Sequence, residues 1–468
     1  MSHDGLNRRA FLRNAGMTAL AGAVGSGSSF AGPLAAAGAG LLAADGKFDF
    51  DTPYNRFGTD SVKYDQQIRT FGKDSVQVGM GIADMDFKCA PSITEALKKR
   101  IEHENWGYLD MGGTLVKSMN DHIVSWNKKR YGITVSPESL VLTTGVHPGI
   151  VATLRAFCPI GSKVLLNTPT YNGFYGDLTA TKTVAEEVPM RLANGRYSID
   201  FDEFERHISG DTNAYILCNP QNPTGNTWSQ DDLLKLGEIC LKHRVVVLAD
   251  EIHCDFVQKG QKYTPFASLP DKAIVNNSIT FKAASKSFGL AAMKCAWFFS
   301  TNASFIERIK PYNRADLTTL GIVSSHGAYS GGEDWLNQCV EYIDGNQDYA
   351  VSYIKTNIPS IKLAKAQGTY LAWLDVTEVA ERINARQLAE EATKKLKDGA
   401  KPVSNSQIVE RYFVRHAKVA MNAGNSYGLG GENHMRMNIA TSRKTLEVAL
   451  NNLANALKNP SPDRTLID

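Results

Sequence analysis

Three polar side chains stand where apolar segments of the sequence end. Lys286 lies in FKAASKSFGL, among alanine and serine residues rather than in a polar setting. An ammonium ion with few polar neighbours is poorly solvated, so this setting favours the neutral amine, which is a nucleophile and a base. Asp250 ends the run VVVLAD, and Asn222 follows AYILC within CNPQNPTGN. Most lysines are solvated surface cations and a lone aspartate can cap a helix, but the three together predict amine chemistry beside a carboxylate.

The turn TTGVHPGIV, which begins at Thr143, has the composition of a phosphate site. Gly145 lets the backbone approach a ligand closely, and the next helix begins with unpaired amide groups at the positive end of its dipole. Glycine is common in turns between strand and helix, so this turn alone is a weak signal. Ligands of open α/β sheets bind at the carboxyl ends of the strands, where this turn would lie with Lys286 and Asp250.

Short apolar runs alternate with helical stretches through the middle of the chain. The runs span 140–145, 163–169, 214–220, 245–250, 278–285 and 295–300. Helices are predicted at 91–103, which starts with the favourable pair Pro91 and Ser92, and at 113–130. Continuous apolar strands separated by amphipathic helices predict an α/β fold with a mostly parallel sheet covered on both faces. The last two runs are close together, which indicates one antiparallel or locally rearranged strand.

Beyond about residue 330 the pattern changes. Helices predicted at 333–356 and 385–397 flank the strand-like segments KLAKAQGTYLAWLDV and HMRMNIATSR. This mixture predicts a smaller α+β domain that is completed by residues before 90. We therefore expect an N-terminal arm (46–90), a large domain (91–330) and a small C-terminal domain (331–468).

Composition and charge argue against several classes of protein. The 468 residues are 43% hydrophobic and 21% charged, as in ordinary globular proteins. A net charge of +3 gives no electrostatic case for nucleic-acid binding. The seven cysteines are scattered without a C-x-x-C pair, so we expect buried thiols and neither a disulfide scaffold nor a metal site. After the first 45 residues no run approaches 18 apolar residues, so no membrane span is expected in the mature chain.

The first 45 residues (1–45) have a different composition. Arg8 and Arg9 precede Phe11 and Leu12, and a weakly hydrophobic run rich in alanine and glycine follows. A charged start, an apolar run and a small-residue ending are typical of a signal peptide, and the paired arginines resemble the twin-arginine signal. The alternative is a disordered tail with a chance Arg-Arg pair. The signal predicts a periplasmic protein that is exported after folding, which suits a chain that acquires a cofactor in the cytoplasm.

In their order and spacing these segments make the chain resemble the fold-type-I enzymes that use pyridoxal 5′-phosphate (PLP), the aspartate aminotransferase superfamily. The resemblance spans residues from about 50 to 455 and is strongest with the cystathionine β-lyase or C–S lyase branch (MalY/PatB type). The segments that carry it are ADMDF, WGY, TTGVHPG, TPTYNGFY, NPQNPTG, ADEIH, AASKSF and HMRMNIATSR. It implies PLP as cofactor, an amino acid as substrate, a mostly parallel seven-stranded sheet in the large domain, and a homodimer.

The resemblance also implies a role for each residue of the site. Lys286 would bond to the cofactor aldehyde and, once displaced by substrate, act as the base at the substrate Cα. Asp250 would keep the pyridine nitrogen protonated, which makes the ring an electron sink. Arg436 would hold the substrate α-carboxylate with its forked guanidinium, unless it forms only a structural ion pair. Further cofactor contacts are implied for Asn222 at the 3′ oxygen, Tyr171 on the ring face (or in the core), Gly145, Val146 and Ser285 at the phosphate, His253, Lys294, and Tyr108 at the phosphate of a second subunit.

Three positions depart from the residues usual in the branch. GLAAMK (289–294) ends in a cation where aminotransferases of the superfamily often carry a phosphate-binding arginine. His147 stands in place of an aliphatic residue, and Asn226 in place of an arginine. None of the three is expected to touch the core of the cofactor, but all bear on the identity of the substrate. The pocket for the substrate side chain is expected around Ile82–Phe87, Tyr108 and a loop at 312–330.

Three functions remain open. A C–S β-lyase would act on an S-substituted L-cysteine such as cystathionine and release a thiol, pyruvate and ammonia. A class I/II aminotransferase would begin identically but return the proton to the cofactor, and its substrate would be an exported amino acid or a peptide-like metabolite. A non-catalytic binding protein would have little need for Lys286, Asp250 and Arg436 together. The branch resemblance favours the lyase, whereas export and Lys294 give weight to the aminotransferase.

Overall fold

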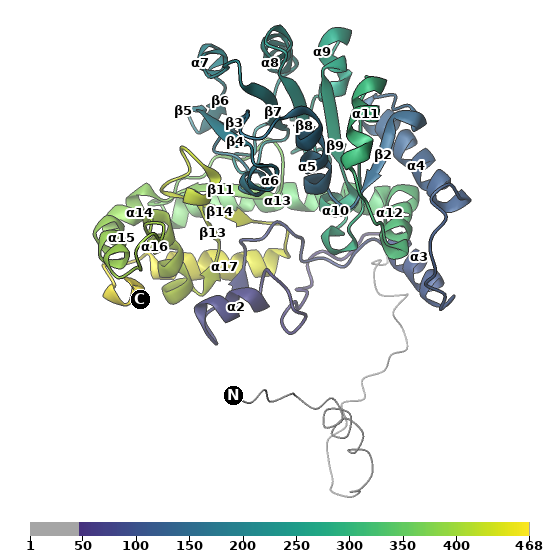
Figure 1. The fold of residues 1–468 in the computed structure, drawn as a ribbon. Coiled ribbons are helices and arrows are strands. Elements are labelled where there is room, and N and C mark those ends of the chain that lie inside the picture. Colours follow the sequence, from purple (N-terminus) through teal and green to yellow (C-terminus); the bar gives the residue numbers. More distant parts are fainter. Residues whose placement is uncertain (1–45, 468) are drawn as a thin grey trace, which may run out of the picture.

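A seven-stranded sheet forms the upper part of the molecule in the computed structural model, which describes residues 46–467 (Figure 1). The predicted signal at 1–45 lies outside the described residues. In spatial order the strands are β2 (Leu140–Thr143), β10 (Ala296–Phe299), β9 (Ser278–Lys282), β8 (Val246–Asp250), β7 (Thr212–Cys218), β3 (Lys163–Thr168) and β4 (Val184–Pro189). β10 runs antiparallel to both of its neighbours and the other pairs are parallel. The predicted mostly parallel sheet with one antiparallel strand is confirmed.

The edge strand β4 was not predicted, because its segment is not one of the apolar runs of the sequence. Its segment VAEEVP carries Glu186 and Glu187, whereas every residue of the central strand β8 is buried. An edge strand has a neighbour on one side only, so its charged side chains can reach solvent or partners at the rim. Glu186 pairs with Lys163 of β3 at 3.1 Å. A strand of this kind therefore lacks the continuous apolar pattern by which the others were found.

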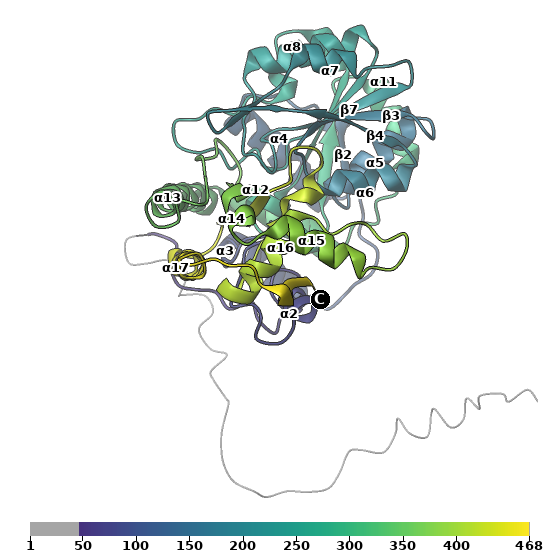
Figure 2. The ribbon, with the colours of Figure 1, turned by 90° about the vertical axis from the view of Figure 1, so that its left-hand side faces the viewer.

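Helices cover both faces of the sheet (Figure 2). On one face lie α5 (Val146–Phe157), α6 (Gly173–Thr181) and α11 (Ala303–Ile309). On the other lie α7 (Phe201–Arg206), α8 (Gln230–Lys242) and α9 (Lys272–Asn276). Each set shares a separate apolar core with the sheet, as expected for strands buried on both sides.

A third group of helices comprises α3 (Pro91–Ile101), α4 (Thr114–Tyr131) and α12 (Thr319–Gly331). The expectation of a loop at 312–330 is wrong, because most of that segment is α12, which is largely buried against α3 and α4. A Cβ at Gly327 would lie 2.9 Å from the carbonyl oxygen of Ser92, so glycine permits the close approach of α3. The many Gly, Ser and Ala residues of α12 hid its helical period, since small side chains give no amphipathic stripe.

The lower part of the molecule contains a three-stranded antiparallel sheet in the order β11 (Leu371–Asp375), β14 (His434–Asn438) and β13 (Asn422–Ala423). Its helices are α13 (Glu333–Asn357), α14 (Thr377–Arg382), α15 (Ala385–Lys394), α16 (Asn405–Tyr412) and α17 (Arg443–Ala456). From the N-terminal arm, which carries α2 (Asp65–Phe71), β1 (Val78–Gly79) pairs with β12 (Val419–Ala420). Residues before 90 thus join this part of the fold, while the three domain boundaries stay predictions.

Two short elements complete the upper part: a hairpin of β5 (Arg191–Ala193) and β6 (Arg196–Ser198), and the single turn α10 (Ala284–Ser287). Six of the seven cysteines are buried, as predicted, whereas Cys89 is partly exposed. In the part of the chain from 46 to 467, none of the helices has the length and apolar content needed to cross a membrane.

Candidate active site

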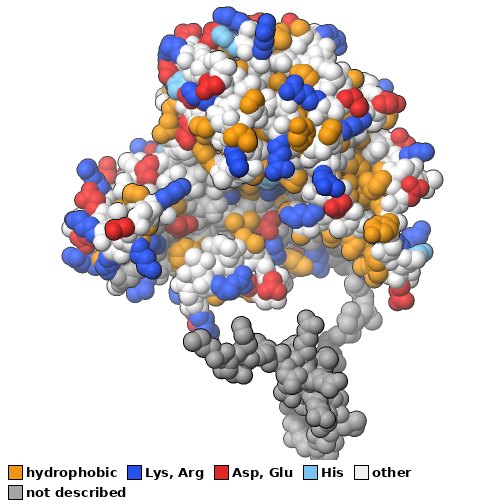
Figure 3. Space-filling model, viewed as in Figure 1, with side chains coloured by type: hydrophobic (Ala, Val, Ile, Leu, Met, Phe, Trp, Pro, Cys, Tyr) orange, Lys and Arg blue, Asp and Glu red, His pale blue; other side chains and the backbone are white. Residues whose placement is uncertain are grey.

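A cavity of about 470 Å³ lies at the carboxyl ends of the parallel strands. Turns that follow β2, β3, β7, β8 and β9 line it, because parallel strands end at one edge of the sheet. Figure 3 shows that the surface is hollowed between the upper and lower parts of the molecule. The cavity brings together nine of the residues predicted from the sequence: Gly145, Val146, Tyr171, Asn222, Asp250, His253, Ser285, Lys286 and Lys294.

Lys286 lies in α10, directly after β9. Its Nζ donates a hydrogen bond to the carbonyl oxygen of Ala83 at 2.8 Å. Burial lowers the pKa of Lys286 to about 8, helped by the positive charge of Arg436 and opposed by Asp84 and Asp250. A substantial share of this amine is therefore neutral near pH 8, as required of a nucleophile or a general base.

Asp250 is the last residue of β8 and is buried at the bottom of the cavity. Its Oδ1 accepts a hydrogen bond from the amide of Ile252 at 3.1 Å. Burial raises the pKa of the Asp250 carboxyl to about 6, and this backbone bond and the charge of His147 oppose the rise. The group is ionised at neutral pH but poorly solvated, so a cationic ligand atom such as a protonated ring nitrogen would suit it.

Arg436 lies on β14 and is 2% exposed. Its guanidinium donates to Asn222 Oδ1 at 3.1 Å and to the carbonyl oxygen of Gly81 at 2.8 Å. The Nε–H of Arg436 is buried and has no hydrogen-bond partner within residues 46–467. A buried donor left unpaired costs about 1–3 kcal/mol, so the site favours an anionic ligand at this point. Because Asn222 uses its carboxamide oxygen for the arginine, its NH₂ group is the part left to donate to a ligand.

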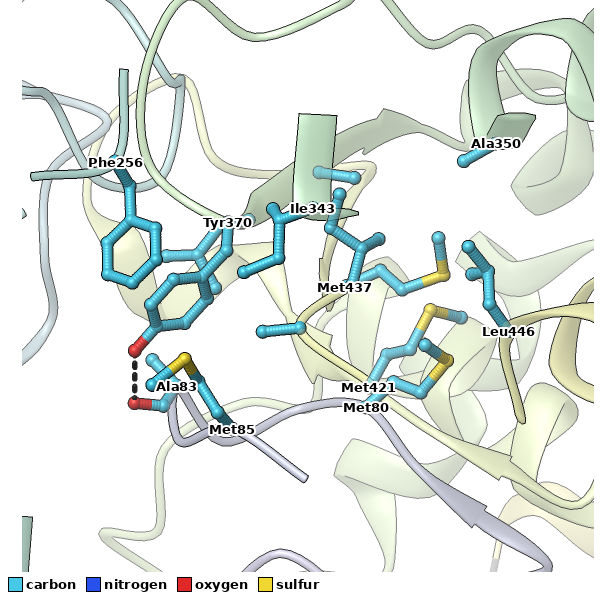
Figure 4. Packing of buried hydrophobic residues seen from close by; sticks show 14 of the residues in the cluster. Met80, Ala83, Met85, Phe256, Ile343, Ala350, Tyr370, Met421, Met437 and Leu446 are labelled. Carbon is cyan, nitrogen blue, oxygen red and sulfur yellow. Dashed lines mark hydrogen bonds between the residues drawn. The ribbon is translucent and has the colours of Figure 1, made fainter. Parts of the chain in front are cut away.

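His253 lines the cavity, and its ring packs against the buried Tyr370. The His253 Nδ1 is buried and has no hydrogen-bond partner among residues 46–467, and burial holds the pKa of this imidazole far below its usual range, so it is neutral. Its ring meets the Tyr370 ring edge-on at 5.5 Å. The Tyr370 hydroxyl donates to the Ala83 carbonyl at 3.0 Å (Figure 4). The same oxygen accepts a hydrogen bond from Lys286. Tyr370 was missed because a single tyrosine in a strand-like segment carries no signal of its own.

His147, the first departure, is in the first turn of α5 and lines the cavity beside Tyr171. The expectation that it does not touch the core of the cofactor stays a prediction. Lys294, the second departure, lines the cavity as well. Asn226, the third, is buried outside it and donates to the carbonyl oxygen of Tyr197 at 2.7 Å. Two of the three unusual residues therefore lie where a ligand would bind.

Tyr108 is not brought to the cavity within one chain. It is fully exposed, and Trp106 nearby is about half exposed. Its predicted contact with a phosphate requires a second copy of the chain and stays a prediction. Arg436 does not itself line the cavity but borders it through Asn222. In the range 46–467, no cluster of three or more His, Cys, Asp or Glu side chains could hold a metal ion.

Comparison with known proteins gives one consistent family. The family model for aminotransferase class I and II matches residues 75–453. Cystathionine beta-lyase PatB of Bacillus subtilis is 34% identical over 87% of this chain and 100% of its own length. The PLP-bound C-S lyase from Staphylococcus hominis is 27% identical, with a TM-score of 0.76 over 90% of this chain and 100% of that one. Cystalysin from Treponema denticola, whose crystal structure contains PLP, is 28% identical, with a TM-score of 0.78 over 88% of this chain and 99% of that one.

Proposed function

Because the chain belongs to the aminotransferase class I and II family, we propose that it binds PLP and cleaves the Cβ–S bond of an S-substituted L-cysteine such as cystathionine. The observation that carries the proposal is one cavity that joins an amine of lowered pKa, Lys286, to a buried carboxylate, Asp250. PLP is a basic aromatic ring that carries an aldehyde. It needs an amine to bond to the aldehyde and a carboxylate to pair with the protonated ring nitrogen.

The described residues fit the parts of PLP. Lys286 supplies the amine for the aldehyde and Asp250 the charge for the ring nitrogen. The phosphate would be held by the amides of Gly145 and Val146 at the start of α5, with the Ser285 hydroxyl and the Lys294 ammonium. When bound, PLP supplies an electron sink for negative charge at the substrate Cα.

The lyase reaction then follows from the residues near Lys286. The guanidinium of Arg436, which borders the cavity through Asn222 and whose buried Nε–H lacks a partner in the described part of the chain, would take the substrate α-carboxylate. The freed Lys286 amine, with a pKa of about 8, takes the Cα proton. The electron pair of the Cα–H bond becomes the Cα=Cβ bond, and the pair of the Cβ–S bond leaves with the sulfur, which takes up a proton. Hydrolysis of the released aminoacrylate gives pyruvate and ammonia.

The name of the relative that is 34% identical over its whole length supports the lyase over other reactions of the family. Transamination is the second candidate. It is favoured by the description of the family model and by Lys294, a cation in the cavity where the branch usually has another residue. Both reactions begin with the same proton removal, so the products must be measured.

The test is to incubate the PLP-loaded protein with L-cystathionine and to follow thiol, pyruvate and the absorption band of the cofactor. A lyase releases thiol and pyruvate in equal amounts over many turnovers. If the cofactor aldehyde is instead lost stoichiometrically and restored by a keto acid, the protein is an aminotransferase and not a lyase. If the protein binds no PLP, both enzymatic functions are contradicted and a non-catalytic binding protein is the remaining hypothesis.

We also propose a homodimer in which Tyr108 reaches the phosphate of the second copy. The support is the full exposure of Tyr108 and its absence from the cavity of its own chain. Light scattering should give twice the mass of one chain, and Tyr108→Phe should weaken PLP binding whereas Tyr54→Phe, another exposed tyrosine, should not. A monomer, or equal PLP affinity of the two variants, would contradict this.

Export to the periplasm by the twin-arginine route is proposed from Arg8, Arg9 and the apolar run that follows. Residues 1–45 fused to a reporter should direct it to the periplasm, and replacement of both arginines by lysine should stop export. A reporter that stays in the cytoplasm would contradict the proposal.

A further inference from the structure

We propose that His147 and Asp177 form a positioning pair that fixes the ring of Tyr171 over the cofactor site. The inference rests on the proposed PLP site but concerns His147 and Asp177, two residues to which the family resemblance gives no role. At position 147 the branch usually has an aliphatic residue. The histidine found here contacts Tyr171, which is a predicted cofactor residue.

The contacts define the arrangement of the pair. His147 Nδ1 lies 2.7 Å from Asp177 Oδ2, and Asp177 is buried in α6. An ionised carboxylate only accepts, so Nδ1 carries a proton and Nε2 is the nitrogen that meets the Tyr171 hydroxyl at 3.4 Å. The two rings lie 5.4 Å apart at 39°. Since 41% of the His147 side chain is exposed, the imidazole has one face toward the cavity and one edge on the carboxylate.

Gly173 shows how closely the rings are packed. A Cβ at this position would lie 2.6 Å from the Cε1 of His147 and 2.6 Å from the Cε1 of Tyr171. A side chain there would force the two rings apart, so glycine at the first position of α6 permits the contact. Gly176, three residues further along the same helix, has open space around the corresponding position.

The charge of the pair acts on Asp250. Burial alone would lower the pKa of His147, but the hydrogen bond and the charge of Asp177 outweigh it and raise the pKa. The other charged groups that face the imidazole are Asp250, which also raises its pKa, and Lys286, which lowers it. In return, a positive charge on His147 opposes the effect of burial on Asp250 and favours its ionised form, whereas the negative charge of Asp177 acts against it. His147, when protonated, therefore supports the carboxylate that the ring nitrogen needs.

The test is the pH dependence of PLP affinity in His147→Gln and Asp177→Asn, measured by titration of the apo-protein. His147→Gln removes a group whose positive charge favours ionised Asp250, so its loss of affinity on acidification should begin about one pH unit higher, with about twofold weaker binding at pH 7, as for a carboxyl whose pKa rises by one unit from about 6. Asp177→Asn also removes a negative charge that raises the pKa of Asp250, so its pH profile should shift less. A merely structural role would weaken binding equally at every pH. Unchanged affinity and pH profile would overturn the inference.

A matched pair of glycine variants tests the geometry separately. Gly173→Ala should weaken PLP binding and reduce the order of the Tyr171 and His147 rings, seen as changed aromatic circular dichroism, whereas Gly176→Ala should leave both unchanged. Equal effects of the two would overturn the positioning role. If the wild-type protein binds no PLP, the proposed function fails; if it binds PLP but the His147, Asp177 and Gly173 variants behave as wild type, only this inference fails.

Discussion

Two lysines four residues apart at the end of β9 have opposite surroundings. Lys282 is 3% exposed and is surrounded by partners. Its Nζ lies 3.7 Å from a carboxylate oxygen of Glu251 and donates to Asn127 Oδ1 at 3.3 Å. Below it are two aromatic faces, those of Tyr131 at 3.9 Å and Tyr263 at 5.5 Å. These groups replace the water that the ammonium lost on burial, so the charge is stable where it is.

Lys286 lacks this compensation. It donates to a neutral carbonyl, that of Ala83, and among residues 46–467 it forms no ion pair within 4.0 Å. The positive charge of Arg436 disfavours its ammonium further. The difference teaches that burial alone does not identify a functional lysine. What points to one is burial without matching partners, because burial of this kind, with nearby positive charge, lowers the pKa into the range of catalysis.

The largest expected effect comes from Lys286→Ala. It removes the group that bonds to the cofactor and takes the Cα proton, so turnover should fall by at least about 10⁴-fold, the upper range for a general base. The unfolding midpoint in urea should change little, since the Ala83 carbonyl, which loses its bond from Lys286, keeps its bond from the Tyr370 hydroxyl. Borohydride reduction of the wild type should leave the pyridoxyl group on the peptide that contains Lys286. A pyridoxyl label on another peptide would show that a lysine other than Lys286 bonds to the cofactor.

Lys282→Met should have the converse effect. It leaves the buried Glu251 carboxylate without its cation, which typically costs about 3–5 kcal/mol. The free energy of unfolding, measured by urea denaturation, should fall by this amount, while the folded fraction still captures PLP. Unchanged stability would mean that Lys282 is not structurally compensated, and the contrast with Lys286 would be lost.

The pH dependence of cofactor capture sharpens the comparison. Only the neutral amine attacks an aldehyde, so the rate at which the apo-protein takes up PLP should rise as the pH passes the value of about 8 for Lys286. An ordinary lysine would give this rise near about 10.4. Stopped-flow absorbance across this range measures it, with Lys286→Ala as the blank. A midpoint near that of free lysine would show that burial does not tune this amine.

The smallest effect is expected for Tyr370→Phe. The hydroxyl donates to the Ala83 carbonyl, which keeps its bond from Lys286 in the variant. Loss of one hydrogen bond costs about 0.5–1.5 kcal/mol, so the free energy of unfolding should fall by that amount and turnover by less than about tenfold. A loss of turnover as large as that of Lys286→Ala would make Tyr370 a catalytic residue.

The predictable parts of the fold were those with a local pattern. β7 and β8 are continuous apolar runs buried on both faces, and their ends were predicted within about two residues. β4 and α12 escaped because an edge strand carries charges and a helix of small residues shows no stripe. The same holds for the site. Residues at strand ends were predictable since parallel strands end together, but His147 depends on how two helices pack.

The sequence by itself determined the chemical types present and the order in which they reach one edge of the sheet: a lysine, an aspartate, an asparagine and a turn suited to phosphate. Only the tertiary structure decided which charges have partners. Tyr131 and Tyr263 reach Lys282 from other segments of the chain, and Ala83 reaches Lys286 from more than 200 residues away. Solvation and electrostatic energy depend on neighbours in space, so two lysines in one short segment can differ in function.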